Sequence, residues 1–150
     1  MKLSRNSYKP ALVLLLLISS CSRIPNTVEA EAAIIEFHTR LNSEEFIAIY
    51  ESSAKATRTN TKRTDVENLL KSIRTNLGKV INSRKEKTIL SHSMDSPSKT
   101  TLIYKTEFEH GSGYEKFEVI NEDGRPAIFF YFLESADLMR KLTSQEQPKR

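Results

Sequence analysis

Residues 99–133 read KTTLIYKTEFEHGSGYEKFEVINEDGRPAIFFYFL, and their pattern is the main indication of the fold class. Apolar and polar residues alternate along it with the period of two that side chains have in a β-strand. The alternation predicts strands at Lys99–Phe108 and Tyr114–Ile120, with the two glycines between them breaking the run. Asp123-Gly124 is a hairpin turn signal, and residues 127–133 predict a last strand that is apolar on both faces.

Ahead of this stretch the apolar residues recur at helical spacing. The spacing predicts three helices, at Thr27–Leu41, at about residues 43–50 and at Asp65–Leu77, and then one long or bent strand at Val80–Met94. Residues 52–63 are mostly Ser, Thr, Lys and Arg, which predicts a polar loop. We also expect a capping box at the start of each helix, where Asn26, Asn42 and Thr64 each precede a Glu by three residues.

Three helices followed by four antiparallel strands predict an α+β domain, with the helices packed on one face of a curved four-stranded sheet. The last strand then has a second apolar face that the helices cannot cover. Ile128, Phe130 and Phe132 are expected on one face, and residues 127, 129, 131 and 133 on the other. Because large exposed apolar patches usually mark interfaces, we expect a cover: a symmetric homodimer through the outer sheet face, or residues 136–142 folding back as a short helix.

The front of the chain has the pattern of an export signal. Lys2, Arg5 and Lys9 precede eight apolar residues, 11–18, which span about 12 Å as a helix against roughly 30 Å of hydrocarbon. The segment is therefore too short for a permanent membrane span, and we expect residues 1–20 to be removed.

Ile18-Ser19-Ser20-Cys21 resembles the bacterial lipobox, an aliphatic residue and two small ones before an invariant Cys. The resemblance implies that the Cys21 thiol receives a diacylglycerol, that cleavage occurs before it, and that the chain is a lipoprotein held to the membrane by lipid. Ser22, in place of the Asp that typically retains lipoproteins in the inner membrane, favours the outer membrane facing the periplasm. The alternative is a free or buried thiol behind a conventional signal peptide.

The domain resembles the cystatin-like or NTF2-like cone, and more narrowly a family of small bacterial domains of unknown function. The residues behind this are FIAIY at 46–50, IRTNLG at 73–78, LIYKTEF at 102–108, YEKF at 114–117 and DGR at 123–125. These are packing and turn positions, so the resemblance supports a fold and not an activity. The expected organisation is a signal peptide at 1–20, a lipidated tether at 21–27, the domain at 28–134, and a short helix with a polar tail at 135–150.

Enzymes of this superfamily, such as the ketosteroid isomerase type, place an acidic base inside the cone, but none of their motifs matches here. The ionisable candidates are His38, His92, His110, Glu107, Glu109 and Tyr104. A solvated or boundary position is favoured for His38 over one in the cone, and a loop or edge position for His92. Glu107 and Glu109 would share a strand face beside His110, a set that can bind metal or transfer protons, yet solvent exposure is favoured because Phe108 faces inward.

Charge excludes one class of partner. Three of the 23 Lys and Arg residues lie in residues 1–20, so the remainder carries 20 against 19 Asp and Glu, too little for a non-specific nucleic-acid binder. Residues 84–87, RKEK, with the Lys and Arg of 55–63 could instead form a basic surface for anionic lipid or an acidic envelope partner. The alternative is that cross-strand pairing neutralises these charges within the fold.

We therefore expect a non-enzymatic, lipid-anchored envelope protein that binds a partner protein or a small ligand, with no cofactor, no metal and no nucleic acid. One Cys allows no disulfide within the chain. The alternative is a small enzyme of the same fold that uses a carboxylate or His in the cone.

Overall fold

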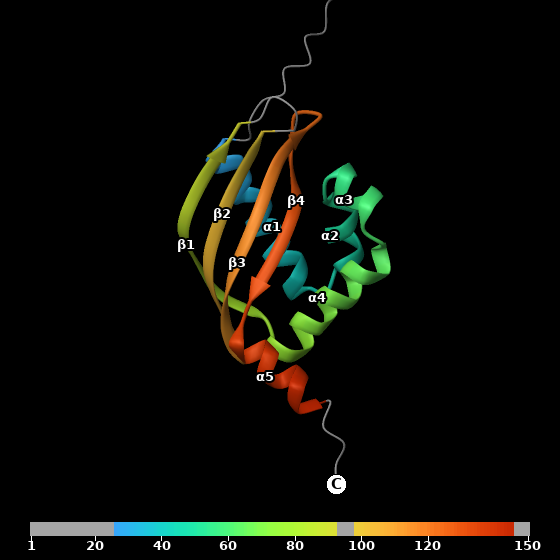
Figure 1. Cartoon of the computed structure of the whole chain (residues 1–150), viewed down its shortest axis with the longest axis vertical. Coiled ribbons are helices and arrows are strands. Elements are labelled where there is room, and N and C mark those ends of the chain that lie inside the picture. The colour runs from blue at the N-terminus through green and yellow to red at the C-terminus, as the bar shows by residue number, and fades with distance from the viewer. Residues whose placement is uncertain (1–25, 93–97, 146–150) are drawn as a thin grey trace, which may run out of the picture.

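The computed structural model describes residues 26–92 and 98–145. Four helices come first: α1 (Thr27–Asn42), α2 (Phe46–Ser52), α3 (Lys55–Asn60) and α4 (Arg63–Leu77). The strands β1 (Val80–Ser91), β2 (Lys99–Phe108), β3 (Gly111–Glu122) and β4 (Arg125–Glu134) and a last helix, α5 (Ala136–Gln145), follow. The protein is α+β, with an open antiparallel sheet in the order β1-β2-β3-β4 (Figure 1). The expected leader, Cys21, the Met94 end of the first strand and the end of the tail lie outside the described residues.

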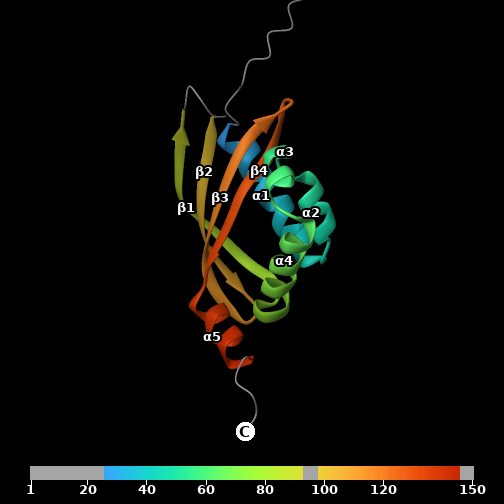
Figure 2. The same cartoon turned by 45° about the vertical axis from the view of Figure 1, so that its right-hand side comes forward.

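Helices α1 to α4 form one layer against the inner face of the curved sheet, and α1 crosses behind the strands (Figure 2). Buried side chains from α1, α4 and the inner faces of β2 and β3 make the core between the layers. The largest fully buried apolar ones are Phe117, Ile34, Leu41, Leu70, Ile73, Leu77, Leu102 and Val119. On α4 the expected residues Leu70, Ile73 and Leu77 are buried, whereas Leu69 is exposed. On α1 the stripe that helical spacing first predicts, Val28, Ala32 and Ile35, is wrong because these side chains face solvent. A second set at helical spacing, Ile34, Phe37 and Leu41, makes the buried face instead.

Of the three expected caps, only the one at Asn26 is confirmed. Its side-chain Oδ1 accepts from the backbone N–H of Glu29 at 2.8 Å. Asn42 is the last residue of α1 and instead bonds both backbone groups of Val80, at 2.8 and 3.1 Å. Thr64 lies inside α4, which begins at Arg63. Asn42 thus joins the end of α1 to the start of the sheet, a long-range role that local spacing does not reveal.

The polar loop expected at 52–63 is wrong, because it contains the short helix α3. The backbone N–H of Ala54 donates to the carbonyl of Ile128 at 2.9 Å, and Thr57 Oγ1 donates to the carbonyl of Phe129 at 2.7 Å. Six residues are too few for a helix to form alone in water. Contact with the edge of β4 therefore stabilises α3, and no local pattern could have shown it.

Two glycines that were expected to break the sheet lie within β3 instead. The strand begins at Gly111, and a Cβ added at Gly113 would come within 2.7 Å of the Glu134 carbonyl and of Leu133. At Gly111 it would come within 2.6 Å of Asp137 on α5. These glycines permit β4 and α5 to approach closely, so they mark packing and not a turn.

The expected faces of the last strand are partly wrong because β4 has a bulge where the register shifts between Glu118 and Val119. Ile128 pairs with Val119, which is fully buried, so Ile128 faces inward and not outward. Beyond the bulge Phe130 and Phe132 face outward, as predicted, at 43% and 52% exposure. A bulge reverses the alternation of faces, which a strict period of two cannot anticipate.

Helix α5 does not fold back over the outer face. It lies at the end of the domain where β3 begins (Figure 1), with Leu138 in the core. Asp137 Oδ2 accepts from the backbone N–H of Ser112 at 2.9 Å, and Lys141 Nζ donates to the carbonyl of Asn76 at 2.6 Å. The expectation that residues 136–142 cover the sheet is therefore wrong, and the outer aromatic side chains stay exposed.

Candidate functional site

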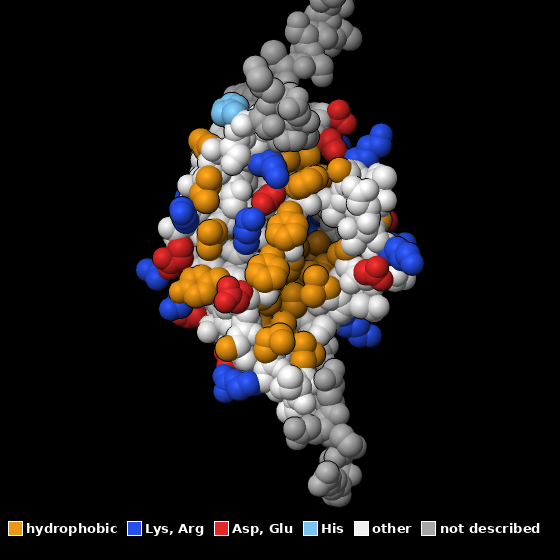
Figure 3. Space-filling view, viewed as in Figure 1, with side chains coloured by type: hydrophobic (Ala, Val, Ile, Leu, Met, Phe, Trp, Pro, Cys, Tyr) orange, Lys and Arg blue, Asp and Glu red, His pale blue; other side chains and the backbone are white. Residues whose placement is uncertain are grey.

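A cavity of 320 Å³ lies between the edge strand β4 and helices α2, α3 and α4. In the space-filling view it is the hollow beside β4 where apolar side chains gather (Figure 3). Its walls are mainly apolar, with Ile49 from α2, Ala56 from α3, Leu69 and Leu70 from α4, and Phe129 and Phe130 from β4. The volume and the apolar walls are those of a site for a small molecule.

The polar groups of this cavity are neutral. No Lys, Arg, Asp, Glu or His is among the described residues that line it. The Tyr50 hydroxyl is bound to the carbonyls of Arg58 and Thr61, and the Thr57 hydroxyl to that of Phe129. Asn60 and Thr61, both exposed, stand where α3 turns into α4. A charged ligand would lose hydration here and gain no counter-ion, so these walls suit a neutral, largely apolar molecule better than a charged one.

A second feature is a buried polar cluster around Glu115 of β3, whose exposure is 0%. One carboxylate oxygen, Oε1, accepts from the Tyr131 hydroxyl at 2.9 Å. The other, Oε2, accepts from Thr106 Oγ1 at 2.5 Å and from His38 Nε2 at 2.8 Å. The Thr106 proton goes to the carboxylate, so Ser83, 2.9 Å away, donates to Thr106. Three donors thus satisfy a fully buried acid.

The tyrosines near this carboxylate stay neutral. Burial, reinforced by the negative charges of Glu31 and Glu115, raises the pKa of Tyr104 from 10.0 to about 12. Burial and the bonded Glu115 carboxylate also raise the pKa of Tyr131 well above its ordinary value. Near neutral pH both phenols can therefore donate a hydrogen bond, but they are poor proton acceptors.

Two aromatic side chains separate the cluster from the cavity. Phe37 and Tyr131 both line the cavity, and their rings lie 4.7 Å apart. The Tyr131 hydroxyl is turned away to Glu115, whereas neither Glu115 nor His38 is among the cavity-lining residues. In this arrangement the cavity and the cluster are separate, and Tyr131 belongs to both: its ring lines the cavity and its hydroxyl binds Glu115.

The sequence placed His38 in solvent or at a boundary, and this is wrong. His38 is 9% exposed and lies inside the domain, edge-on to Tyr104 and Phe117. From the position of His38 on its helix, the side chain could face either solvent or the inside of the domain. It faces inward, where it bonds Glu115, 77 residues away in the sequence. Tyr104 was also a candidate, and it is buried beside His38.

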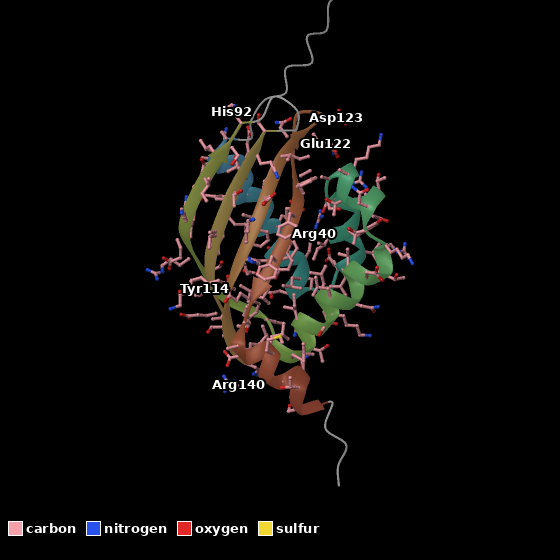
Figure 4. The ribbon with its side chains drawn as sticks, viewed as in Figure 1. Arg40, His92, Tyr114, Glu122, Asp123 and Arg140 are labelled. Carbon is pink, nitrogen blue, oxygen red and sulfur yellow. The ribbon has the colours of Figure 1, made fainter. Side chains whose placement is uncertain are left out.

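The other ionisable candidates do not form a site. His92 lies at the end of β1, at the same end of the domain as Glu122 and Asp123 (Figure 4), with its Nδ1 3.4 Å from Ser98 Oγ. Glu107 is exposed on β2, as expected, and His110 is exposed in the turn that follows. They do not converge on one point.

Glu109 lies in that turn and not on the strand, so it shares no strand face with Glu107. Its Oε2 accepts from the backbone N–H of Lys79 at 2.8 Å. This bond, more than the nearby charges of Arg74, His110 and Lys79, lowers the pKa of Glu109. Glu109 therefore holds the start of β1 and has a structural role.

Sequence reasoning missed Glu115, Thr106 and Tyr131. A signal for Glu115 was present: it stands two residues before Phe117, and the period of two puts both on the inner face. The signal was hidden because a charged residue beside Lys116 reads as part of a solvated strand. Arg40, also unremarked, binds Glu36 at 2.6 Å and the Ala48 carbonyl at 3.1 Å, which joins α1 to α2 (Figure 4).

The basic surface expected from two segments is divided in the structure. Residues 84–87 lie on β1, at one edge of the sheet, whereas residues 55–63 lie beside β4, at the other (Figure 1). Local partners engage several of these cations: Lys85 pairs with Glu31, Arg84 with Glu86, and Arg63 with Glu67. The two runs therefore do not make one continuous basic surface.

Within residues 26–92 and 98–145, no three His, Cys, Asp or Glu side chains gather as metal ligands would. No helix in these ranges has the length and apolar character needed to cross a membrane.

No family model matches the chain, and the search of curated proteins found no match. Among solved structures the chain is similar to a function unknown protein from Mycobacterium tuberculosis. The identity is 9% and the TM-score 0.49, over 77% of this chain and 83% of that one. At this score the similarity is too weak to support a shared fold or a shared function.

Proposed function

We propose that this chain is a lipid-anchored envelope protein whose NTF2-like domain binds a small, neutral, largely apolar molecule in the cavity between β4 and α4. The observation that carries the ligand class is the 320 Å³ cavity, whose described lining residues are uncharged. The cone assignment rests on the curved sheet, the helices on its inner face and the cavity at its open edge.

The anchor rests on the sequence of the leader. Ile18-Ser19-Ser20-Cys21 supports lipidation of Cys21, and Ser22 supports the outer membrane, facing the periplasm. Two or three acyl chains suffice for stable anchoring without a transmembrane helix. Replacing Cys21 by Ser should abolish metabolic labelling with a fatty acid and leave the precursor uncleaved. A Cys21→Ser chain that still matures and fractionates with membranes would contradict the anchor.

The ligand class can be tested with N-phenyl-1-naphthylamine, a neutral apolar probe that fluoresces when it leaves water. The chain 22–150 is suitable, because the buried core residues that the structure describes all lie between Ala30 and Leu138. We expect saturable binding that Ala56→Phe abolishes, since the new ring would fill the cavity from α3. Ala32→Phe is the matched control, because Ala32 is exposed on α1 outside the cavity. Equal binding by both variants would place the probe elsewhere and refute the site.

A small enzyme is the second candidate, and the buried Glu115–His38 pair is the observation that favours it. Such a pair could transfer a proton if Tyr131 turned aside and admitted the substrate. Binding alone is better supported, because three donors already engage the carboxylate. If the chain is an enzyme, the Glu115→Gln variant should still bind the probe but should no longer convert a substrate that the wild-type chain converts. A variant that still converts that substrate would exclude Glu115 as the base.

A further inference from the structure

The outer face of β3 and β4 exposes a patch of large apolar side chains. Tyr114, Phe130 and Phe132 are 49%, 43% and 52% exposed. Phe132 pairs across the strands with Lys116, and Tyr114 pairs with Lys105 of β2 and Glu134 of β4. In the space-filling view apolar side chains follow β4 to the hollow of the cavity, and an acidic side chain separates them from an apolar one farther to the left (Figure 3). Figure 4 locates Tyr114 on the lower half of β3. We call Tyr114, Phe130 and Phe132 the outer aromatic patch.

Lysines stand among these aromatic side chains. Lys116 Nζ lies 5.3 Å from the ring centroid of Phe130, and Lys99 Nζ lies 5.2 Å from that of Phe129. Both lysines also bind Glu118, at 2.7 and 3.0 Å, so this carboxylate is already neutralised. Aromatic side chains enter the interface between water and hydrocarbon, and lysines extend to anionic headgroups. The chemistry of the patch therefore complements a bilayer surface that contains anionic lipid.

The length of the tether limits where the domain can go. From Cys21 to Asn26, where the described structure begins, the chain reaches at most about 18 Å. Helix α1 starts at the end of the domain that carries the β3–β4 turn (Figure 1). A lipid on Cys21 would therefore keep this end of the domain within about 18 Å of its bilayer, close enough for the outer face of the sheet to lie on the headgroups.

We propose that the outer aromatic patch, with Lys105 and Lys116, docks on the surface of an anionic bilayer. The tether argument rests on the proposed lipidation of Cys21, but the patch itself does not. A second copy of the chain is the other possible occupant. Beside the patch, Lys99, Lys105 and Lys116 outnumber the carboxylates of Glu118 and Glu134. The bilayer is favoured because this excess of lysine attracts anionic headgroups, whereas two copies of the face would set one excess against the other.

Docking by this face has a consequence for the cavity. Phe130 belongs to the patch and also lines the cavity. The mouth of the cavity would then open beside the headgroups, where a neutral apolar molecule can pass from the lipid into the protein without crossing water.

The test is co-sedimentation of the soluble chain 22–150, without added ligand, with vesicles of phosphatidylethanolamine that contain or lack phosphatidylglycerol. The patch variant is Tyr114→Ser with Phe132→Ser, neither of which lines the cavity. The matched control is Val28→Ser with Ile35→Ser, two exposed apolar residues of α1, at 76% and 66% exposure. Circular dichroism checks that each variant is folded.

We expect binding to the anionic vesicles that weakens with added salt and that the patch variant reduces by roughly tenfold or more, with the control unchanged. Equal binding by patch and control variants, or none by the wild type, would overturn the proposal. A wild-type dimer in sedimentation velocity that only the patch variant dissociates would also overturn it, because a second copy would then be the occupant. Loss of probe binding in Ala56→Phe with vesicle binding intact shows that the cavity and the patch are tested separately.

Discussion

Replacing Glu115 by Ala should destabilise the domain more than any single change on the surface of the sheet. The substitution leaves three buried donors, from His38, Thr106 and Tyr131, without their acceptor. Each buried donor left without an acceptor costs about 1 to 3 kcal/mol of unfolding free energy. Removal of the buried negative charge and local relaxation offset part of the total for the three donors. Removing one partner of a buried charged network costs about 3 to 5 kcal/mol, and we expect a loss in this range.

Urea unfolding of chain 22–150, followed by circular dichroism, measures this loss. With a slope of about 2 kcal/mol per molar urea, the midpoint should fall by about 1.5 to 2.5 M at an unchanged slope. Glu107→Ala is the matched control: it removes a Glu that is exposed on the neighbouring strand, and it should change stability by at most about 0.5 kcal/mol.

Glu115→Gln distinguishes the effect of losing hydrogen-bond acceptors from the effect of losing side-chain volume. The amide fills the same space and keeps one acceptor oxygen, but it turns an NH₂ group toward the remaining donors. Its cost should fall between that of Ala and the wild type. If both Glu115 variants unfolded within about 1 kcal/mol of the wild type, the carboxylate would not be holding these donors, and the interpretation of the cluster would be wrong.

Three further outcomes follow from burial and charge. Leu70→Ala, at 1% exposure, should cost about 2 to 5 kcal/mol in urea unfolding, and Leu69→Ala, its neighbour at 48%, markedly less; equal losses would contradict the packing of α4. Because burial raises the pKa of Tyr131, the free energy of unfolding should fall as the pH rises above 10. Tyr131→Phe should make this fall shallower. An unchanged dependence on alkaline pH would place the Tyr131 hydroxyl in water. Burial raises the pKa of Glu118, but bonds from Lys116 and Lys99 outweigh it and lower the pKa, so the stability that Glu118 adds at neutral pH is lost as the pH falls through the lowered value. Glu118→Gln should therefore make the fall in unfolding free energy at acid pH shallower. A fall identical to that of the wild type would argue against these pairs.

The strands and the main helices could be predicted because local pattern determines them. β2 was predicted with the bounds it has, Lys99–Phe108, and α4 ends before Gly78, whose φ of 81° only a glycine adopts easily. In these elements one face is buried and the other solvated, so the period of the apolar residues carries the information.

The candidate site could be predicted only in part. The notion of an acid or a His inside the domain was available as an alternative, but the residues were not, since Glu115 and His38 meet across 77 positions of sequence. A charged side chain at an inward strand position is normally a sign of exposure. It becomes a sign of burial only when three donors from other elements are known to surround it.

Local sequence pattern predicted the α+β class and the order of the elements apart from α3, and its resemblance to a lipobox predicts lipidation of Cys21, because each rests on residues that are neighbours along the chain. The features at the β4 edge of the sheet depend instead on tertiary contacts. Contact with β4 makes α3 a helix, and the bulge turns Ile128 inward and leaves Phe130 at the mouth of a cavity. These features depend on the register between strands and on contacts between distant segments, and both are settled by packing energies that no local window of sequence contains.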